Sequence, residues 1–76
     1  MKTITMNKAG IPDILACSST GRFWAIEVKT LRGKASRLQL HWIAKLQANG
    51  AVAFIAYGWD DFLVQFNNRA IFEANS

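Results

Sequence analysis

The sequence has very few of the residues that cross-link or interrupt small folds. Its 76 residues include one cysteine and one proline. A single cysteine, Cys17, excludes an intrachain disulfide framework and a zinc site built from several cysteines. Because Cys17 ends the apolar run ILAC, we expect a buried strand thiol. A reactive cysteine would need a histidine partner, and nothing in the sequence brings the single histidine, His41, close to it.

Long hydrophobic runs are also missing. No apolar stretch approaches the roughly 18 residues that a membrane span requires. The first residues, MKTITMNK, lack the apolar segment of a signal peptide. We therefore expect an intracellular, cytoplasmic protein.

Acidic residues are scarce, with 5 Asp and Glu against 9 Lys and Arg, a formal charge of +4. This balance favours a polyanionic partner, although such a charge is also ordinary for a soluble domain. The hydrophobic fraction of 51% predicts a folded chain, and its length predicts one small domain over residues 1–76. So short a chain has a small core, so a homodimer would bury further apolar surface. We expect the aromatic second half to form core or interface rather than a platform for stacking bases.

The apolar pattern predicts a small mixed sheet flanked by helices, an α/β fold of order β(β)β–α–β–α. Short runs of apolar and β-branched residues predict strands at TITM (3–6), DILAC (13–17), RFWAIEVK (22–29) and AVAFIAY (51–57). A helix between the last two strands permits a right-handed parallel crossover.

Two helices are expected in the second half. Ser36 suits the N-cap of the first helix, which runs over residues 37–49 with Gly50 after its end. Its apolar face is expected to comprise Leu38, Trp42 and Leu46, with Ile43 beside them. A second helix starts at Asp60 or Asp61 and reaches about residue 74, and both aspartates are interpreted as helix caps.

Two carboxylates, Asp13 and Glu27, stand inside apolar runs, where unpaired charges are rare. If residues 19–21 form a three-residue loop with Gly21 in the left-handed region, Asp13 lies opposite Glu27 in a hairpin. Like charges at that distance are destabilising unless one takes up a proton or both share a cation. A loop one residue longer or shorter would put the two on opposite faces.

Strand alternation places Lys29 on the same face as Glu27, beside the small Ala25. Two carboxylates and a backbone carbonyl form a hard-oxygen set that suits Mg²⁺ or Mn²⁺. A lysine beside such a metal can orient water and stabilise charge on a phosphate. The alternative is a plain ion pair between Glu27 and Lys29 on a half-solvated strand.

A series of short motifs follows in a fixed order along the chain. The order is GIPD, a hairpin, EVK, a basic glycine-containing loop, and then Ser36 and Gln39 at the start of a helix. Over about residues 7–57 the chain resembles the VRR-NUC family of the PD-(D/E)xK nuclease superfamily, which implies a restriction-endonuclease-like core. The resemblance implies that Asp13, Glu27 and the backbone carbonyl of Val28 hold the metal. It also implies that Lys29 is the catalytic lysine and that Gln39 faces the active site.

The function that the resemblance implies is a metal-dependent, structure-selective DNA endonuclease. Single-domain members, often from phages, look like homodimeric resolvases of four-way (Holliday) junctions, which implies a bacterial or phage-infected host cell. Hydrolysis would proceed by in-line attack of a metal-activated water. Four basic residues flank the expected site and would either contact DNA phosphates or keep the surface soluble: Lys8, Arg32, Lys34 and Arg37.

One departure from the family pattern leaves alternatives open. Family members usually carry an upstream helix with a glutamate that joins the site, and MKTITMNKA before GIPD shows neither. The chain is then expected to be a short branch of the family or a late-starting sequence. The rival hypotheses are a catalytically incomplete, nuclease-like DNA-binding module and a small assembly or adaptor protein.

Overall fold

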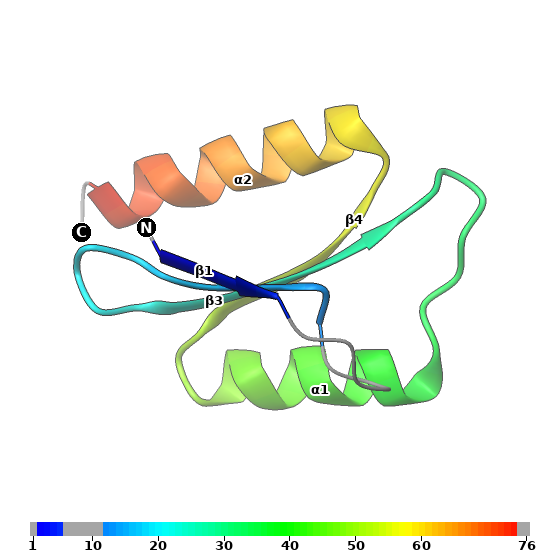
Figure 1. Ribbon diagram of the computed structural model, residues 1–76, viewed down its shortest axis with the longest axis horizontal. Coiled ribbons are helices and arrows are strands. Elements are labelled where there is room, and N and C mark those ends of the chain that lie inside the picture. Colours follow the sequence, from blue (N-terminus) through cyan, green and yellow to red (C-terminus); the bar gives the residue numbers. More distant parts are fainter. Residues whose placement is uncertain (1, 6–11, 75–76) are drawn as a thin grey trace.

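The fold is a mixed β-sheet between two helices. The computed structural model describes the backbone of residues 2–5 and 12–74, and the side chains of residues 12–71. Its elements are β1 (Lys2–Thr5), β2 (Ile14–Cys17), β3 (Phe23–Lys29), α1 (Arg37–Ala48), β4 (Val52–Tyr57) and α2 (Trp59–Ala74). The strands lie in the order β1-β2-β3-β4, antiparallel up to β3 and parallel between β3 and β4. Figure 1 shows α1 and α2 on opposite sides of the sheet. The predicted α/β architecture is confirmed.

Element boundaries differ from expectation by one or two residues: β2, β3 and β4 each begin one residue later than predicted, and α1 ends one residue earlier. β1 begins at Lys2, one residue early, and Met6 lies outside the described residues. α2 begins at Trp59 rather than at an aspartate, because the Phe62 N–H already donates to the Gly58 carbonyl at 3.1 Å. Gly58 has a φ of 87°, a conformation that favours glycine and lets the chain turn from β4 into the helix.

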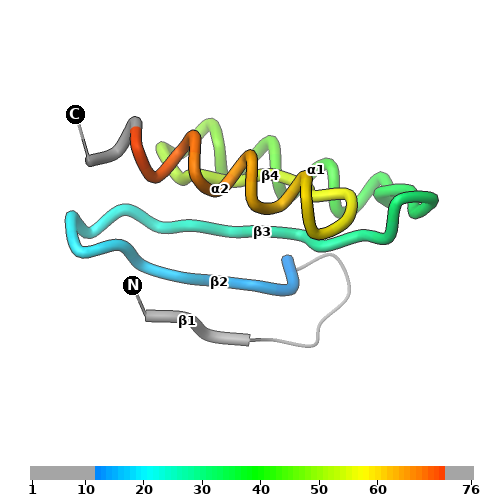
Figure 2. The backbone as a smooth tube through the Cα atoms, turned by 90° about the horizontal axis from the view of Figure 1, so that it is seen from above, coloured from blue at the N-terminus to red at the C-terminus, as the bar shows by residue number. Residues whose placement is uncertain are grey.

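The hairpin between β2 and β3, visible side by side in Figure 2, has the predicted register. The Gly21 N–H donates to the Ser18 carbonyl at 3.0 Å, and Gly21 has a φ of 86°. This is the turn with a left-handed glycine that a three-residue loop requires. The resulting ladder runs from Cys17 opposite Phe23 to Ile14 opposite Ile26.

Cys17 is exposed, so the prediction of a buried thiol is wrong. It pairs with Phe23 at the turn end of the hairpin, and Phe23 is itself 40% exposed. The apolar run therefore continues past the part of the sheet that the helices cover.

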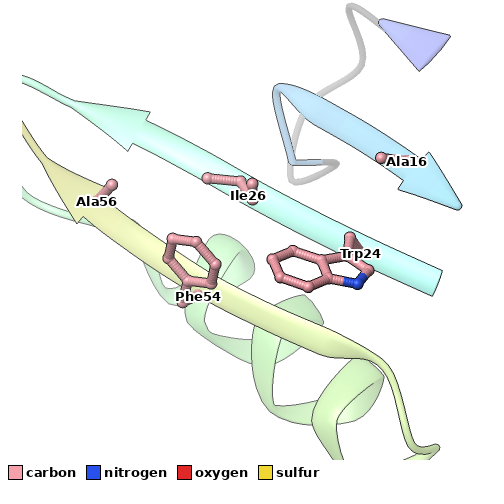
Figure 3. Packing of buried hydrophobic residues seen from close by; sticks show 5 residues of the cluster. All are labelled: Ala16, Trp24, Ile26, Phe54 and Ala56. Atoms are coloured by element: carbon pink, nitrogen blue, oxygen red, sulfur yellow. The ribbon is translucent and has the colours of Figure 1, made fainter. Parts of the chain in front are cut away.

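The two faces of the sheet carry buried clusters built from side chains of different size. Towards α2 the buried cluster includes large side chains, with Trp24 and Phe66 ring centroids 5.3 Å apart. Figure 3 shows how the buried members of this cluster lie: Ala16, Trp24, Ile26, Phe54 and Ala56. Towards α1 the cluster consists of Ala25, Ile43 and Ala53. Because two of these three are alanines, α1 can lie close to the sheet.

The inner face of α1 is rotated from the predicted one. Ile43 is its buried residue, whereas Leu38 is 46% exposed. Leu46 packs against the buried cluster as expected. The inward positions thus follow the spacing of Gln39, Ile43 and Leu46, which turns Gln39 towards β3.

Side chains from both helices occupy the outer edge of β4. An open strand edge exposes unpaired backbone N–H and C=O groups, which can pair with a strand of another chain. Polar side chains that hydrogen-bond these backbone groups make such pairing less favourable. Three hydrogen bonds do so here: Gln47 Nε2 to the Ala53 carbonyl at 2.7 Å, Gln65 Nε2 to the Ile55 carbonyl at 2.9 Å, and the Tyr57 N–H to Asp61 Oδ2 at 2.8 Å. Asp61 thus accepts a hydrogen bond from a backbone N–H at the edge of β4, a role that its interpretation as a helix cap did not include.

Candidate active site

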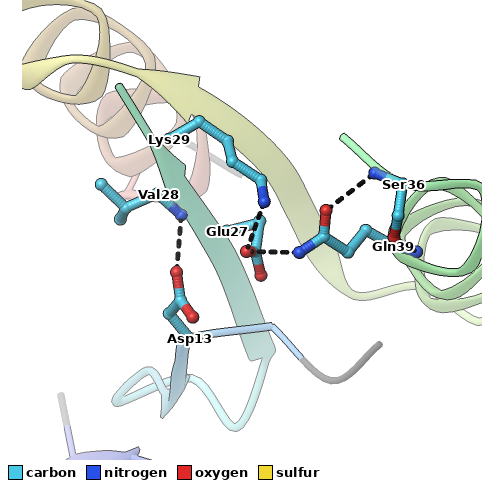
Figure 4. Close-up of polar contacts among 6 residues, drawn as sticks. All are labelled: Asp13, Glu27, Val28, Lys29, Ser36 and Gln39. Carbon is cyan, nitrogen blue, oxygen red and sulfur yellow. Dashed lines mark hydrogen bonds and ion pairs between the residues drawn. The ribbon is translucent and has the colours of Figure 1, made fainter. Parts of the chain in front are cut away.

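Four polar side chains meet where β2 begins and β3 ends. Asp13 stands directly before β2, Glu27 and Lys29 lie near the end of β3, and Gln39 lies in the first turn of α1. Figure 4 shows these side chains together with Val28 and Ser36. The hairpin brings Asp13 to β3, and the crossover after β3 brings Gln39 to Glu27.

Glu27 is the buried charged residue among the described side chains, with 3% of its surface exposed. Its Oε1 accepts a hydrogen bond from Gln39 Nε2 at 2.8 Å and lies 3.5 Å from Lys29 Nζ. Its Oε2 is buried and has no hydrogen-bond partner among the described residues. A buried carboxylate oxygen without a partner is costly, so this atom marks a place where a cation or a proton would be stabilising.

Burial is the main reason why the pKa of Glu27 lies above its ordinary value. The negative charge of Asp13 raises this pKa further, and the ammonium of Lys29 partly offsets both effects. The direction of the Asp13 effect is the one expected for two carboxylates on neighbouring strands.

Asp13 is exposed and accepts a hydrogen bond at Oδ2 from the backbone N–H of Val28, at 3.2 Å. The regular ladder ends one residue later, at Ile14 opposite Ile26. Continuing that register places Asp13 opposite Glu27, as the hairpin argument predicted. Asp13 therefore lies beside the end of β3, the strand that carries Glu27 and Lys29.

Gln39 has two structural roles at once. Its backbone N–H donates to Ser36 Oγ at 3.1 Å, and its side-chain Oε1 accepts from the Ser36 N–H at 2.9 Å. These bonds form a capping box at the start of α1. The remaining amide nitrogen donates to Glu27. The Ser-x-x-Gln spacing of residues 36–39 is the signature of such a box, and sequence reasoning used only its serine.

The basic residues predicted to contact DNA follow the site in the chain. Arg32 and Lys34 are exposed in the loop after β3, and Arg37 is exposed at the first position of α1. Lys8 lies outside the described residues.

The donor set fits a small, hard divalent cation. Asp13 and Glu27 supply carboxylate oxygens, and one of these oxygens is buried without a partner. Oxygen ligands of this kind are those that Mg²⁺ and Mn²⁺ prefer. Among the side chains that the structure describes, no third His, Cys, Asp or Glu joins the pair. The contribution of the Val28 carbonyl stays a prediction.

The chain has a small α/β fold that is consistent with a PD-(D/E)xK-like nuclease core. The features that agree with such a core are the parallel β3–β4 pair, the helix that connects these strands, and the hairpin that carries the carboxylates. The family model of the VRR-NUC domain matches residues 1–60, and the chain therefore belongs to the VRR-NUC family. It is thus a nuclease-family protein, and a nuclease domain implies DNA as its substrate. No curated protein and no solved structure matches the chain. Neither described helix is long and apolar enough to span a bilayer.

Proposed function

We propose that the chain is a metal-dependent endonuclease that hydrolyses phosphodiester bonds in branched DNA. The observation that carries this proposal is the unpartnered, buried Oε2 of Glu27, with Asp13 and Lys29 beside the same carboxylate. A solvated ion pair would leave Glu27 exposed and satisfied by water. A buried carboxylate with one oxygen unpaired is instead typical of a site that binds a cation or a proton.

In this proposal Asp13, Glu27 and the backbone carbonyl of Val28 hold Mg²⁺ or Mn²⁺. A bound divalent cation supplies Lewis-acid stabilisation and lowers the pKa of a coordinated water. The hydrogen bond from the Val28 N–H holds the Asp13 carboxylate against β3. The bond from Gln39 holds Oε1 of Glu27, so Gln39 acts as a positioning residue.

Lys29 is the proposed catalytic lysine. Its side chain is 21% exposed, so the ammonium lies at the edge of the site, where a scissile phosphate can approach. An ammonium there can hold the attacking water in line and stabilise the negative charge that develops on the phosphate. Its 3.5 Å approach to Glu27 keeps it on the face that carries the carboxylate.

Shape rather than base sequence is the proposed basis of substrate choice. Arg32, Lys34 and Arg37 offer charges that bind phosphates, and such contacts position DNA without reading bases. A four-way junction requires two cuts, and a homodimer would supply one site for each. Exposed apolar side chains on α2 support an association of this kind: Trp59, Val64 and Ile71. Sedimentation velocity at micromolar concentration measures that association.

The test is cleavage of a labelled four-way junction beside a linear duplex of matching sequence, each with Mg²⁺, Mn²⁺ or EDTA. The proposal expects metal-dependent cutting of the junction, loss of cutting in Lys29→Ala, and a duplex left intact. Equal cutting of both substrates would refute structure selectivity. Cutting in EDTA would refute the metal dependence.

A second candidate function is a DNA-binding module with an incomplete nuclease site. The support for this candidate is that, among the described residues, only two carboxylates lie at the site and no third ligating side chain joins them. Such a module would bind the junction without cutting it in any metal. Its affinity would still fall steeply with salt, because the exposed basic residues contact phosphates.

A further inference from the structure

A cavity lies away from the candidate active site, at the opposite end of β3 and β4. It has a volume of about 320 Å³. Its polar lining comes from Arg22 before β3, Gln47 near the end of α1, and Asn68 and Arg69 in α2. Apolar residues at the start of β4 complete the wall: Ala51, Val52 and Ala53. No role in the proposed hydrolysis involves these residues.

The lining has the composition of an anion site. Its lining residues include two arginines and two residues with carboxamide side chains, and none of them is acidic. Guanidinium groups present several N–H donors in a planar fork that suits the oxygens of a phosphate. With two arginines and no acidic residue in the lining, an anion bound in the cavity would be stabilised by their positive charges.

Arg69 is held in place before any ligand binds. Its guanidinium lies 4.5 Å from the ring centroid of Phe54, in a cation–π contact. Its Nη1 also donates to the Gln65 carbonyl at 3.4 Å. Gln47 is fixed as well, since its amide nitrogen donates to the Ala53 carbonyl. A preorganised lining loses less conformational entropy when it binds a ligand.

The cavity and the candidate active site are separated along the strands. Trp24 pairs with Val52 at one end of the parallel ladder, and Lys29 pairs with Tyr57 at the other. In Figure 1 the start of β4 and the end of α2 lie on the side opposite the loop that follows β3. At about 3.3 Å per residue, Arg22 and Lys29 are roughly 23 Å apart along the strand direction. About seven base pairs of duplex cover that distance at 3.4 Å per step.

We propose that this cavity binds a phosphate group. The backbone of DNA is one source of that group, and the separation of about 23 Å would make the cavity a second anchor along a bound duplex. A small phosphate monoester is the other source with the same chemistry. The proposal goes beyond the nuclease function, because the cavity can hold phosphate whether or not the carboxylate site cuts DNA.

The test is a titration of ¹⁵N-labelled protein with inorganic phosphate at constant ionic strength, followed by backbone amide shifts. Saturable shifts are expected at the start of β4 and around Asn68. Asn68→Asp introduces a negative charge into the lining, and Asn67→Asp is its matched control on the neighbouring exposed position. We expect Asn68→Asp to weaken phosphate binding about tenfold and Asn67→Asp to change it far less.

Arg22→Gln, compared with the exposed Lys45→Gln, tests the same cavity from the hairpin side. The proposal is overturned by the absence of saturable shifts at the lining residues, or by equal effects of the two asparagine variants. Because Asn67 and Asn68 are both exposed on α2, neither variant disturbs the core, and their comparison does not depend on Arg22→Gln folding.

The source of the phosphate is decided by titrating a short duplex in EDTA, where no cleavage occurs. Shifts at the cavity that inorganic phosphate reverses would assign the site to the DNA backbone. Duplex-induced shifts confined to the basic loop after β3, with phosphate still binding the cavity, would assign it to a small phosphate compound. Neither titration requires hydrolysis of DNA. A protein without nuclease activity would therefore leave the test of phosphate binding at this cavity unaffected.

Discussion

Glu27 is the residue on which the proposed chemistry depends. Of its two carboxylate oxygens, one is bound by Gln39 and Lys29 and the other is buried without a partner among the described residues. An arrangement of this kind costs folding free energy and is retained where function requires it. The stability of the metal-free protein should therefore increase when the charge at residue 27 is removed.

Glu27→Gln, measured in EDTA, should unfold at a higher temperature than the unchanged chain at neutral pH. Because the pKa of Glu27 is raised in the fold, the folded state binds its proton more tightly than the unfolded state does. The resulting stability is complete below the unfolded pKa, near 4.5, and is lost as pH rises through the folded pKa. The advantage of Glu27→Gln should thus shrink as the pH falls towards that value.

The control for this comparison is Asp60→Asn, which removes an exposed acidic charge. It should show no such gain in unfolding temperature at neutral pH. Thermal unfolding across pH measures both variants, and a Glu27→Gln protein that is less stable than the unchanged chain at neutral pH would contradict this reading of the site.

Some contacts of individual residues could be predicted from the sequence, and others could not. The position of Gly21 fixes the loop length, and the loop length fixes the register that brings Asp13 towards Glu27. The exposure of Cys17 was missed because an apolar run does not say where the covering helices end. The hydrogen bond from the Val28 N–H to Asp13 depends on the backbone bend before β2, and no side-chain pattern in the sequence predicts that bend.

At the scale of elements, the start of α1 is connected directly to the site. The capping box of Ser36 and Gln39 fixes the first turn of the helix, and the same glutamine side chain reaches Glu27. The apolar spacing alone favoured a face containing Leu38, because it could not show that Ala25 and Ala53 leave room for Ile43. The strand and helix order was predictable because each element has a clear apolar period and a cap or glycine at its end.

Variants of the capping box can separate its structural role from its role in the site. Ser36→Ala should cost about 1 kcal/mol of unfolding free energy through loss of the cap. Gln39→Glu preserves a residue that suits the box but puts a carboxylate against Glu27. We expect Gln39→Glu to reduce cleavage far more than Ser36→Ala does, with denaturant unfolding and junction cleavage as the measurements. Equal loss of cleavage in the two variants would mean that Gln39 acts only through the helix.

The edge of β4 offers a matched pair of neighbouring aspartates in the first turn of α2. Asp61 accepts from the Tyr57 N–H at 2.8 Å and from Gln65 Nε2 at 3.0 Å, whereas Asp60 is exposed. Both experience the same helix dipole, so their difference isolates the contacts of Asp61. Asp61→Ala should destabilise the protein by about 1–3 kcal/mol more than Asp60→Ala, because it leaves a part-buried N–H unpaired. Urea unfolding of the two variants checks this, and similar midpoints would contradict it.

For the whole molecule, the parallel pairing of β3 and β4 gives the sheet two chemically different ends. The ends of both strands meet the carboxylates and the basic loop, and their beginnings meet the arginine-lined cavity. The carboxylate end was predictable from the register of one hairpin and the resemblance to a nuclease family. The cavity was not, because Arg22, Gln47 and Arg69 are far apart in the chain and only the fold brings them together.

The central claim is that Asp13 and Glu27 form a divalent-cation site, and the most direct measurement is thermal unfolding as a function of Mn²⁺ concentration. At about ten times the Kd, binding to the folded state adds about 1.4 kcal/mol, or roughly 5–10 °C in Tm for a domain of this size. We predict this rise in the unchanged chain and in the control Asp60→Asn, and its loss in Asp13→Asn. A rise of equal size in all three proteins would contradict the claim, since it would place the bound metal elsewhere.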